Sequence, residues 1–160
     1  MRIYTLGYQG IHIDAFVKFL TSQGVETVVD VRELPLSRKP GFSKSALAAT
    51  LDQSDLAYTH RPALGCPKPI RNRYSEDSNW ASYKTALLRY LDKQGDALSD
   101  VTALAERTSC TLLCYEADYN FCHRSMVADA MARIGGMSVS HLSAQSAKTS
   151  PFADSLPTFD

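Results

Sequence analysis

Short apolar segments alternate along this chain with longer segments whose apolar residues recur at helical spacing. Val28, Val29 and Val31 form a β-branched, nearly continuous apolar run, which is typical of a strand covered on both faces of a sheet. We predict five strands, at residues 3–6, 27–31, 56–59, 111–115 and 138–141. Strands that alternate with helices predict an α/β fold. We expect a single three-layer domain in which a mostly parallel sheet of about five strands is flanked by helices.

An amphipathic helix is predicted directly after the first strand. Ile13, Phe16, Val17 and Leu20 place their apolar side chains on one stripe, and Gly24 is expected to end that helix. The same periodicity predicts further helices at residues 44–51, at residues 79–93, and after Cys122, where Val127, Ala130, Met131 and Ile134 recur on one face.

One domain is expected to account for most of the chain, because 160 residues is about the length of a single domain. We place it at residues 1–142, followed by a polar C-terminal tail at residues 143–160. Within the domain, residues 62–77 contain several prolines and show no clear period. This segment is predicted to be a long loop that acts as a lid or a binding loop.

The overall charge gives no general argument for a nucleic-acid or membrane partner, because 17 basic residues balance 17 acidic ones. The distribution is uneven, however, with eight basic and three acidic residues between positions 32 and 73. An anionic partner is expected if this stretch folds onto one face, and a solvated surface is the simpler alternative.

The predicted location is the cytoplasm, with no membrane partner. No segment approaches the length of a membrane span, and the first residues lack the charged leader and apolar core of a signal peptide. In that compartment, the cysteines are expected to be thiols or ligands rather than structural disulfides.

Reactive side chains concentrate where the fourth predicted strand is followed by a helix. Cys122, His123 and Arg124 fall at the start of that helix, where backbone N–H groups and the helix dipole favour an anion. Cys122 is therefore predicted to be a nucleophilic or redox thiolate, and a buried structural thiol is the alternative. The predicted catalytic residues are Cys122, Glu116, His123 and Asp30.

Polar residues also follow the second predicted strand. Asp30 and Arg32 lie two positions apart and therefore point the same way, either as an ion pair that locks the loop or as part of a site. Ser37 and Arg38 supply donors suited to a phosphate or carboxylate. The predicted substrate-binding residues are Tyr8, Arg32, Ser37, Arg38 and Arg124.

A divalent metal is an alternative for the same segment, since Cys114, Glu116, Cys122 and His123 are all competent zinc ligands. Their spacing is not one of the closed zinc-finger patterns. No cofactor is therefore predicted, and the metal is kept as the weaker hypothesis.

Several motifs occur in order along the chain. They are Gly7-Tyr8-x-Gly10, Asp30-Val31-Arg32-x-x-Pro35-x-Ser37 with Phe42 beyond, Leu64-Gly65, and Cys114-x-Glu116-x-Asp118-x-x-x-Cys122-His123-Arg124. Together they resemble the domain of unknown function family 488, over roughly residues 3–142. The resemblance implies a compact α/β domain with enzymatic capacity and no settled reaction. The chain departs from the family's usual pattern at Cys66, where a glycine is frequent, and at Tyr119, where a proline is frequent.

The sequence leaves three functions open. The first is an enzyme that acts on an anionic small molecule, such as a phosphate-bearing or nucleotide-like compound. Its reaction would be that of a hydrolase or transferase with a possible thiolate nucleophile, or that of a thiol redox enzyme. The second is a nucleic-acid-binding module that uses the basic stretch at residues 32–73, with Phe42 or Tyr74 as stacking surfaces. The third is a protein-interaction domain whose site has lost its reaction. The oligomeric state is not predicted.

Overall fold

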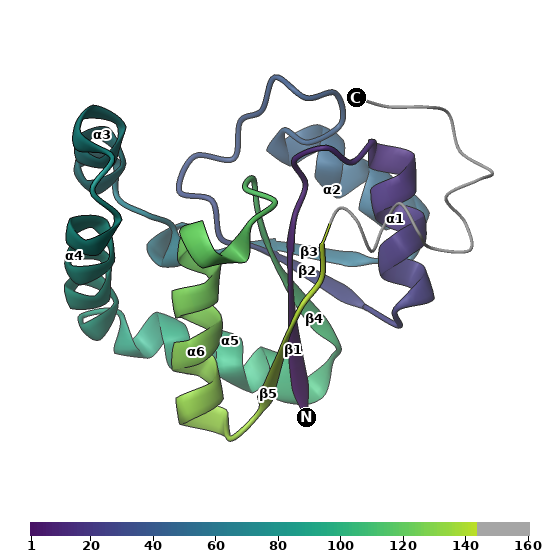
Figure 1. Cartoon of the computed structure of the whole chain (residues 1–160). Coiled ribbons are helices and arrows are strands. Elements are labelled where there is room, and N and C mark those ends of the chain that lie inside the picture. Colours follow the sequence, from purple (N-terminus) through teal and green to yellow (C-terminus); the bar gives the residue numbers. More distant parts are fainter. Residues whose placement is uncertain (144–160) are drawn as a thin grey trace.

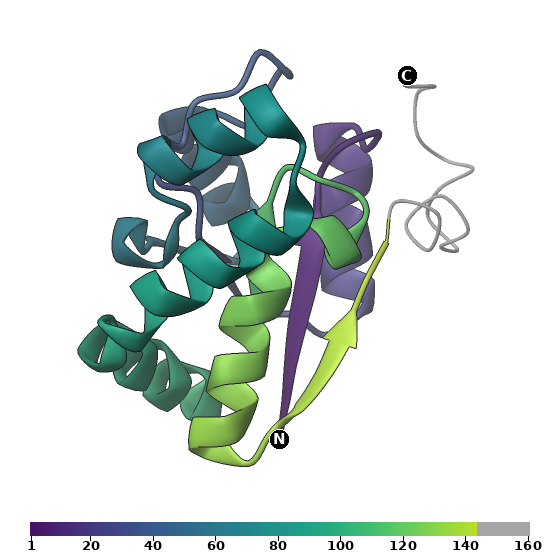
Figure 2. The ribbon, with the colours of Figure 1, turned by 60° about the vertical axis from the view of Figure 1, so that its left-hand side comes forward.

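A computed structural model describes residues 1–143, which form one five-stranded parallel sheet with helices on both faces (Figures 1 and 2). The order of the strands across the sheet is β3-β2-β4-β1-β5, and every neighbouring pair is parallel. The predicted α/β fold with a flanked sheet is therefore confirmed. The strands are β1 (Arg2–Gly7), β2 (Thr27–Asp30), β3 (Ala57–His60), β4 (Cys110–Cys114) and β5 (Ser138–His141).

The helices divide between the two faces of the sheet. One buried cluster packs α1 and α2 against the sheet, and a second packs α4, α5 and α6 against the opposite face. Adjacent strand residues alternate between these clusters: Val28 lies in the first and Val29 in the second. The helices are α1 (Ile13–Ser22), α2 (Lys44–Gln53), α3 (Lys68–Asp77), α4 (Trp80–Asp92), α5 (Gly95–Arg107) and α6 (His123–Gly135).

β4 lies between β1 and β2 in the sheet. The chain leaves β4 toward one face of the sheet, whereas it leaves β1 and β2 toward the other face. α1 and α2, which follow β1 and β2, pack on one face, whereas α6, which follows β4, packs on the other. Where connections leave neighbouring parallel strands in opposite directions, a crevice opens at the carboxyl ends of the strands, and ligands bind there in sheets of this type. The topology therefore places a crevice on both sides of the end of β4.

The prediction of a long loop at residues 62–77 was wrong. The segment contains a short 3-10 helix at Pro62–Leu64 and the helix α3, which stands beside α4 at one side of the molecule (Figure 1). Pro69 lies in the first turn of α3, where a helix tolerates the missing N–H group. No residue of α3 is buried, so the helix has no apolar stripe that a periodicity search could find.

The helix α5 was not predicted at all, although Leu98, Val101 and Ala105 are buried at helical spacing. The predicted tail at residues 143–160 lies outside the described residues, apart from Ser143. None of the helices in residues 1–143 is long and apolar enough to cross a bilayer.

A buried ion pair holds the loop that follows β2. Both carboxylate oxygens of Asp30 accept hydrogen bonds from the Arg32 guanidinium, at 2.8 and 2.7 Å, and Tyr58 on β3 donates to the same carboxylate at 2.5 Å. Arg32 also donates to the backbone carbonyl of Phe42 at 2.6 Å and to the hydroxyl of Tyr8 at 3.2 Å. Burial opposes the charge on Arg32, but the contact with Asp30 outweighs it, so the pKa of Arg32 is raised. The Asp30–Arg32 pair and its hydrogen bonds thus tie together β3 and the segments after β1 and β2.

Replacing the Asp30 carboxylate should therefore destabilise the fold strongly. Asp30→Asn leaves the Arg32 charge buried without its anionic partner, and we expect a loss of about 3–5 kcal/mol in the free energy of unfolding, measured by urea denaturation. The matched control is Glu33→Gln, since Glu33 pairs with Arg71 at the same 2.7 Å but both side chains are more than a third exposed. The loss in the free energy of unfolding of Glu33→Gln should stay within about 1 kcal/mol. Equal losses in the two variants would contradict the structural role of the Asp30–Arg32 pair.

Candidate active site

A cavity of about 900 Å³ lies where β1, β2 and β4 end. Its wall is formed by the segments that follow these strands, by the start of α6 and by part of α3. The volume is ordinary for a site that takes a small molecule. Of the predicted site residues, those that line the cavity are Tyr8, Arg32, Ser37, Arg38, Cys114, Glu116, Cys122 and His123.

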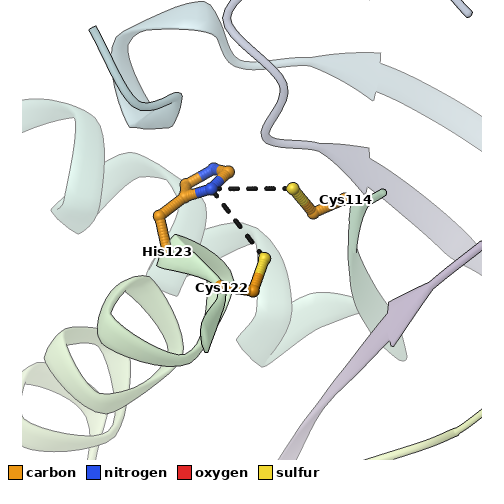
Figure 3. A group of neighbouring side chains, drawn as sticks. All are labelled: Cys114, Cys122 and His123. Carbon is orange, nitrogen blue, oxygen red and sulfur yellow. Dashed lines mark hydrogen bonds between the residues drawn. The ribbon is translucent and has the colours of Figure 1, made fainter. Parts of the chain in front are cut away.

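Cys114, Cys122 and His123 lie together in the wall of the cavity, and we call them the thiol–imidazole cluster (Figure 3). Cys114 ends β4, Cys122 directly precedes α6, and His123 is the first residue of α6. The Nδ1 atom of His123 is 3.6 Å from the Sγ atom of Cys114 and 4.0 Å from that of Cys122. The end of the strand and the start of the helix thus place two thiols around one ring nitrogen.

The other ring nitrogen of His123 orients the imidazole. Nε2 is 2.7 Å from the backbone carbonyl oxygen of Val31, at the end of β2. A carbonyl only accepts hydrogen bonds, so Nε2 carries the proton and donates it. In the neutral ring, Nδ1 then presents its lone pair to the sulfur atoms of Cys114 and Cys122.

The groups of the cluster shift one another's protonation. Burial disfavours a thiolate at Cys122, but hydrogen bonds with Cys114 and His123 outweigh it and lower the pKa of Cys122 well below its ordinary value. The hydrogen bond with Cys122 and burial both raise the pKa of Cys114. Burial lowers the pKa of His123, but the contact with Cys122 reverses this and raises it overall. These shifts favour the thiolate form at Cys122 and the neutral thiol at Cys114.

Glu116 adds a carboxylate beside the cluster. Its Oε2 atom accepts a hydrogen bond from the Cys114 thiol at 3.6 Å. Partial desolvation and the negative charge of Cys122 raise the pKa of Glu116 above its ordinary value. Glu116 is therefore placed where a carboxyl group could exchange a proton with a bound molecule.

Arg124, predicted to bind the substrate, lies outside the cavity lining and is fully buried. Its guanidinium donates to the backbone carbonyls of Glu116 at 2.5 Å and Ala117 at 3.3 Å, and to the Thr5 hydroxyl at 3.2 Å. These bonds fix the loop between β4 and α6. The anion-binding role of Arg124 stays a prediction, because in this structure its guanidinium donates to these protein oxygen atoms.

Asp30, predicted as a proton carrier, is also fully buried and lies behind Arg32 rather than in the cavity wall. Its carboxylate is occupied by Arg32 and Tyr58. Of the two alternatives that the sequence left open for this pair, the geometry matches the ion pair that locks the loop.

Cationic side chains line the part of the cavity formed by the segment after β2. Arg38 is exposed and Lys39 is half-buried, and neither forms an ion pair within residues 1–143. The Ser37 hydroxyl accepts a hydrogen bond from the backbone N–H of Lys39 at 3.1 Å, which orders the backbone between them. Arg71 of α3 also lines the cavity, and its guanidinium contacts Glu33.

Two glycines let backbone segments approach closely at this site. A Cβ atom on Gly7 would overlap the carbonyl oxygen of Glu116, and a Cβ atom on Gly65 would overlap the backbone nitrogen of Glu33. These contacts account for the glycines in two of the sequence motifs. The Gly7 contact brings the end of β1 against the start of the β4–α6 loop, and the Gly65 contact brings the segment after β3 against the segment after β2.

The sequence missed part of the cavity lining. Arg71 was not predicted as a site residue, and Tyr74 was predicted only as a stacking surface of the nucleic-acid alternative, because their helix, α3, was predicted as a loop. Their spacing is the one signal that could have found them, since residues three apart share a helix face. The lining residues absent from the predicted site are Gln9, Gly10, Glu33, Leu34, Leu36, Lys39, Cys66, Arg71, Tyr74, Ser75, Tyr83, Tyr115 and Phe121.

The thiol–imidazole cluster could also hold a metal ion. The Sγ atoms of Cys114 and Cys122 and a ring nitrogen of His123 all lie within 4.8 Å of one another. Glu116, the fourth ligand that the sequence predicts for a metal, falls outside this group of three.

Comparison with known proteins gives one family. Residues 12–131 match the model of the family described as a domain of unknown function, DUF488. No curated protein and no solved structure gives a match. The matched segment covers more than half of the 160 residues and contains β2, β4, the start of α6 and the whole thiol–imidazole cluster. The chain therefore belongs to the DUF488 family.

Proposed function

We propose that this protein is an enzyme that binds a small anionic molecule in the cavity and acts on it at the thiol–imidazole cluster. One observation carries the proposal: Cys114, Cys122 and His123 share the wall of a 900 Å³ cavity with Arg38 and Lys39. The reactive cluster and two cationic side chains that could bind an anionic substrate thus line the same cavity.

The cationic part of the lining supports an anionic substrate. Arg38 and Lys39 have no acidic partner within the described part of the chain, so their charge is available to a ligand. An arginine can bind a phosphate or a carboxylate through two parallel hydrogen bonds. Tyr74, Tyr115 and Phe121 line the same cavity and suit a substrate with a flat or apolar part beside its anionic group.

The chemistry that fits the cluster is a hydrolase or transferase reaction. Cys122 is the candidate nucleophile by its place at the start of α6 and next to His123. Glu116, within 3.6 Å of the Cys114 sulfur, is the candidate proton carrier. Arg124 is a positioning residue, because its hydrogen bond to the Glu116 carbonyl fixes the loop that carries this carboxylate.

The ion pairs formed by basic residues of the basic stretch favour a small molecule over a nucleic acid. Within the stretch at 32–73, Arg32 is buried against Asp30 and Arg73 pairs with Asp77 on α3. These cations are therefore not free to follow a phosphate backbone, which needs several unpaired charges along one surface.

Binding can be tested without knowing the reaction. We expect some members of a panel of sugar phosphates, nucleotides and dicarboxylates to raise the melting temperature of the protein, and calorimetry to give their affinity. The double variant Arg38→Ala/Lys39→Ala should bind such a ligand about 10- to 100-fold more weakly, because it removes charged hydrogen-bond donors.

The control for this double variant is Lys44→Ala/Lys68→Ala, which removes the same charge from residues outside the cavity lining. It should leave the affinity unchanged. Equal weakening in both variants would indicate non-specific attraction. Tight binding of a labelled oligonucleotide with a steep dependence on salt, and none of the panel, would favour the nucleic-acid alternative.

Turnover of a ligand found in this way should depend on the cluster. Cys122→Ser should lower kcat/KM by at least about 100-fold, and Cys110→Ser should leave it unchanged. Cys110 is a suitable control because it is buried at the opposite end of β4, outside the cavity lining. Full activity in Cys122→Ser would remove Cys122 from the reaction.

A further inference from the structure

We infer that the thiol–imidazole cluster is a zinc site with one open coordination position that faces the cavity. The ligands are the Sγ atoms of Cys114 and Cys122 and the Nδ1 atom of His123. The inference rests on the proposed function for the location of the reacting centre, and it assigns Cys122 there as a zinc ligand in place of a free nucleophile.

The separations of the two sulfur atoms from the ring nitrogen fit a tetrahedral ion. Zinc bonds of about 2.3 Å to sulfur and 2.0–2.1 Å to nitrogen place neighbouring ligand atoms about 3.5–3.8 Å apart. The observed distances from His123 Nδ1 are 3.6 Å to the Cys114 sulfur and 4.0 Å to the Cys122 sulfur. These two separations lie within a few tenths of an ångström of the zinc geometry, and all three ligand atoms lie within 4.8 Å of one another.

The hydrogen bond of His123 to the backbone supplies a second, independent argument. A histidine that binds a metal usually donates its other N–H group to a carbonyl or carboxylate, which holds the ring in place. Here Nε2 donates to the Val31 carbonyl at 2.7 Å, and Nδ1 is left to face both sulfur atoms. A protein carbonyl therefore orients the imidazole before any ion arrives.

Burial and ligand type argue for zinc in particular. The three ligand residues are each at most 6% exposed, so an ion there would lose most of its water. Two sulfur ligands and one imidazole suit zinc, whereas magnesium and calcium require oxygen ligands. Two thiolates and a neutral imidazole would balance the charge of the ion, which makes its burial favourable.

Three protein ligands leave a fourth position on zinc for water or substrate, the arrangement that separates catalytic from structural zinc sites. All three residues line the cavity, so this position opens onto the space proposed for the substrate. The Glu116 carboxylate lies 3.6 Å from the Cys114 sulfur and lines the same cavity. The anionic group held by Arg38 and Lys39 would then lie in the same cavity as the ion.

Metal content tests the site directly. The full chain, purified without a histidine tag and dialysed against zinc, should retain about one zinc ion per chain by elemental analysis. Cys114→Ser, Cys122→Ser and His123→Gln should each weaken zinc binding by more than about 10- to 100-fold, the loss that removal of an outer-shell partner alone causes. Cys110→Ser, which leaves the cluster intact, should bind zinc like the unchanged chain.

Cobalt in place of zinc gives a second readout that does not depend on the variants being folded. The unchanged chain with cobalt should show the intense visible bands of a tetrahedral ion and the sulfur-to-cobalt charge transfer of two thiolate ligands. A spectrum without thiolate charge transfer, or zinc retention in Cys122→Ser equal to that of the unchanged chain, would overturn the inference.

The two proposals fail differently. Zinc bound at the cluster by a chain that binds no member of the anion panel would support the metal site and contradict the proposed function. Anion binding and turnover by a chain free of metal would contradict the metal site and leave the proposed function standing, with Cys122 acting as a free thiol.

Discussion

The parallel pairing of β4 with β1 on one side and β2 on the other governs the geometry of this protein. Because α6 leaves β4 on the face opposite to α1 and α2, the chain diverges on both sides of the β4 end. Cys114 is the last residue of that strand, and Cys122 and His123 lie where the chain enters the next helix. The cavity and its reactive groups therefore follow from the strand order, and the loops only complete the wall.

Charged residues near the site divide into two groups with different tasks. Arg32 and Arg124 are buried, and their guanidinium groups hold backbone carbonyls and a carboxylate in place. Arg38 and Lys39 are more exposed and make no ion pair within residues 1–143. The buried arginines give the site its rigidity, whereas the exposed pair supplies its charge. The predicted substrate-binding residues include arginines of both kinds, Arg32 and Arg124 from the first group and Arg38 from the second.

Much of the fold could be predicted because strong apolar patterns mark the strands and α1. The predicted strand at residues 138–141 matches β5, and the others lie within one residue of the observed ends. The polar helix α3 could not be found, since its position depends on tertiary contacts and not on an apolar stripe. The proximity of Cys114, Cys122 and His123 was expected from their place after a strand. The contact of His123 with Val31, a residue 92 positions away, could not be read from local sequence.

The strand order also sets when this sheet can form. β1 is paired only with β4 and β5 in the described part of the chain, so its nearest partner begins at Cys110. A growing chain can pair β2 with β3 early, but β1 must wait until most of the domain has left the ribosome. The reactive centre is completed in the same late event, when β4 inserts between two strands that were made long before it.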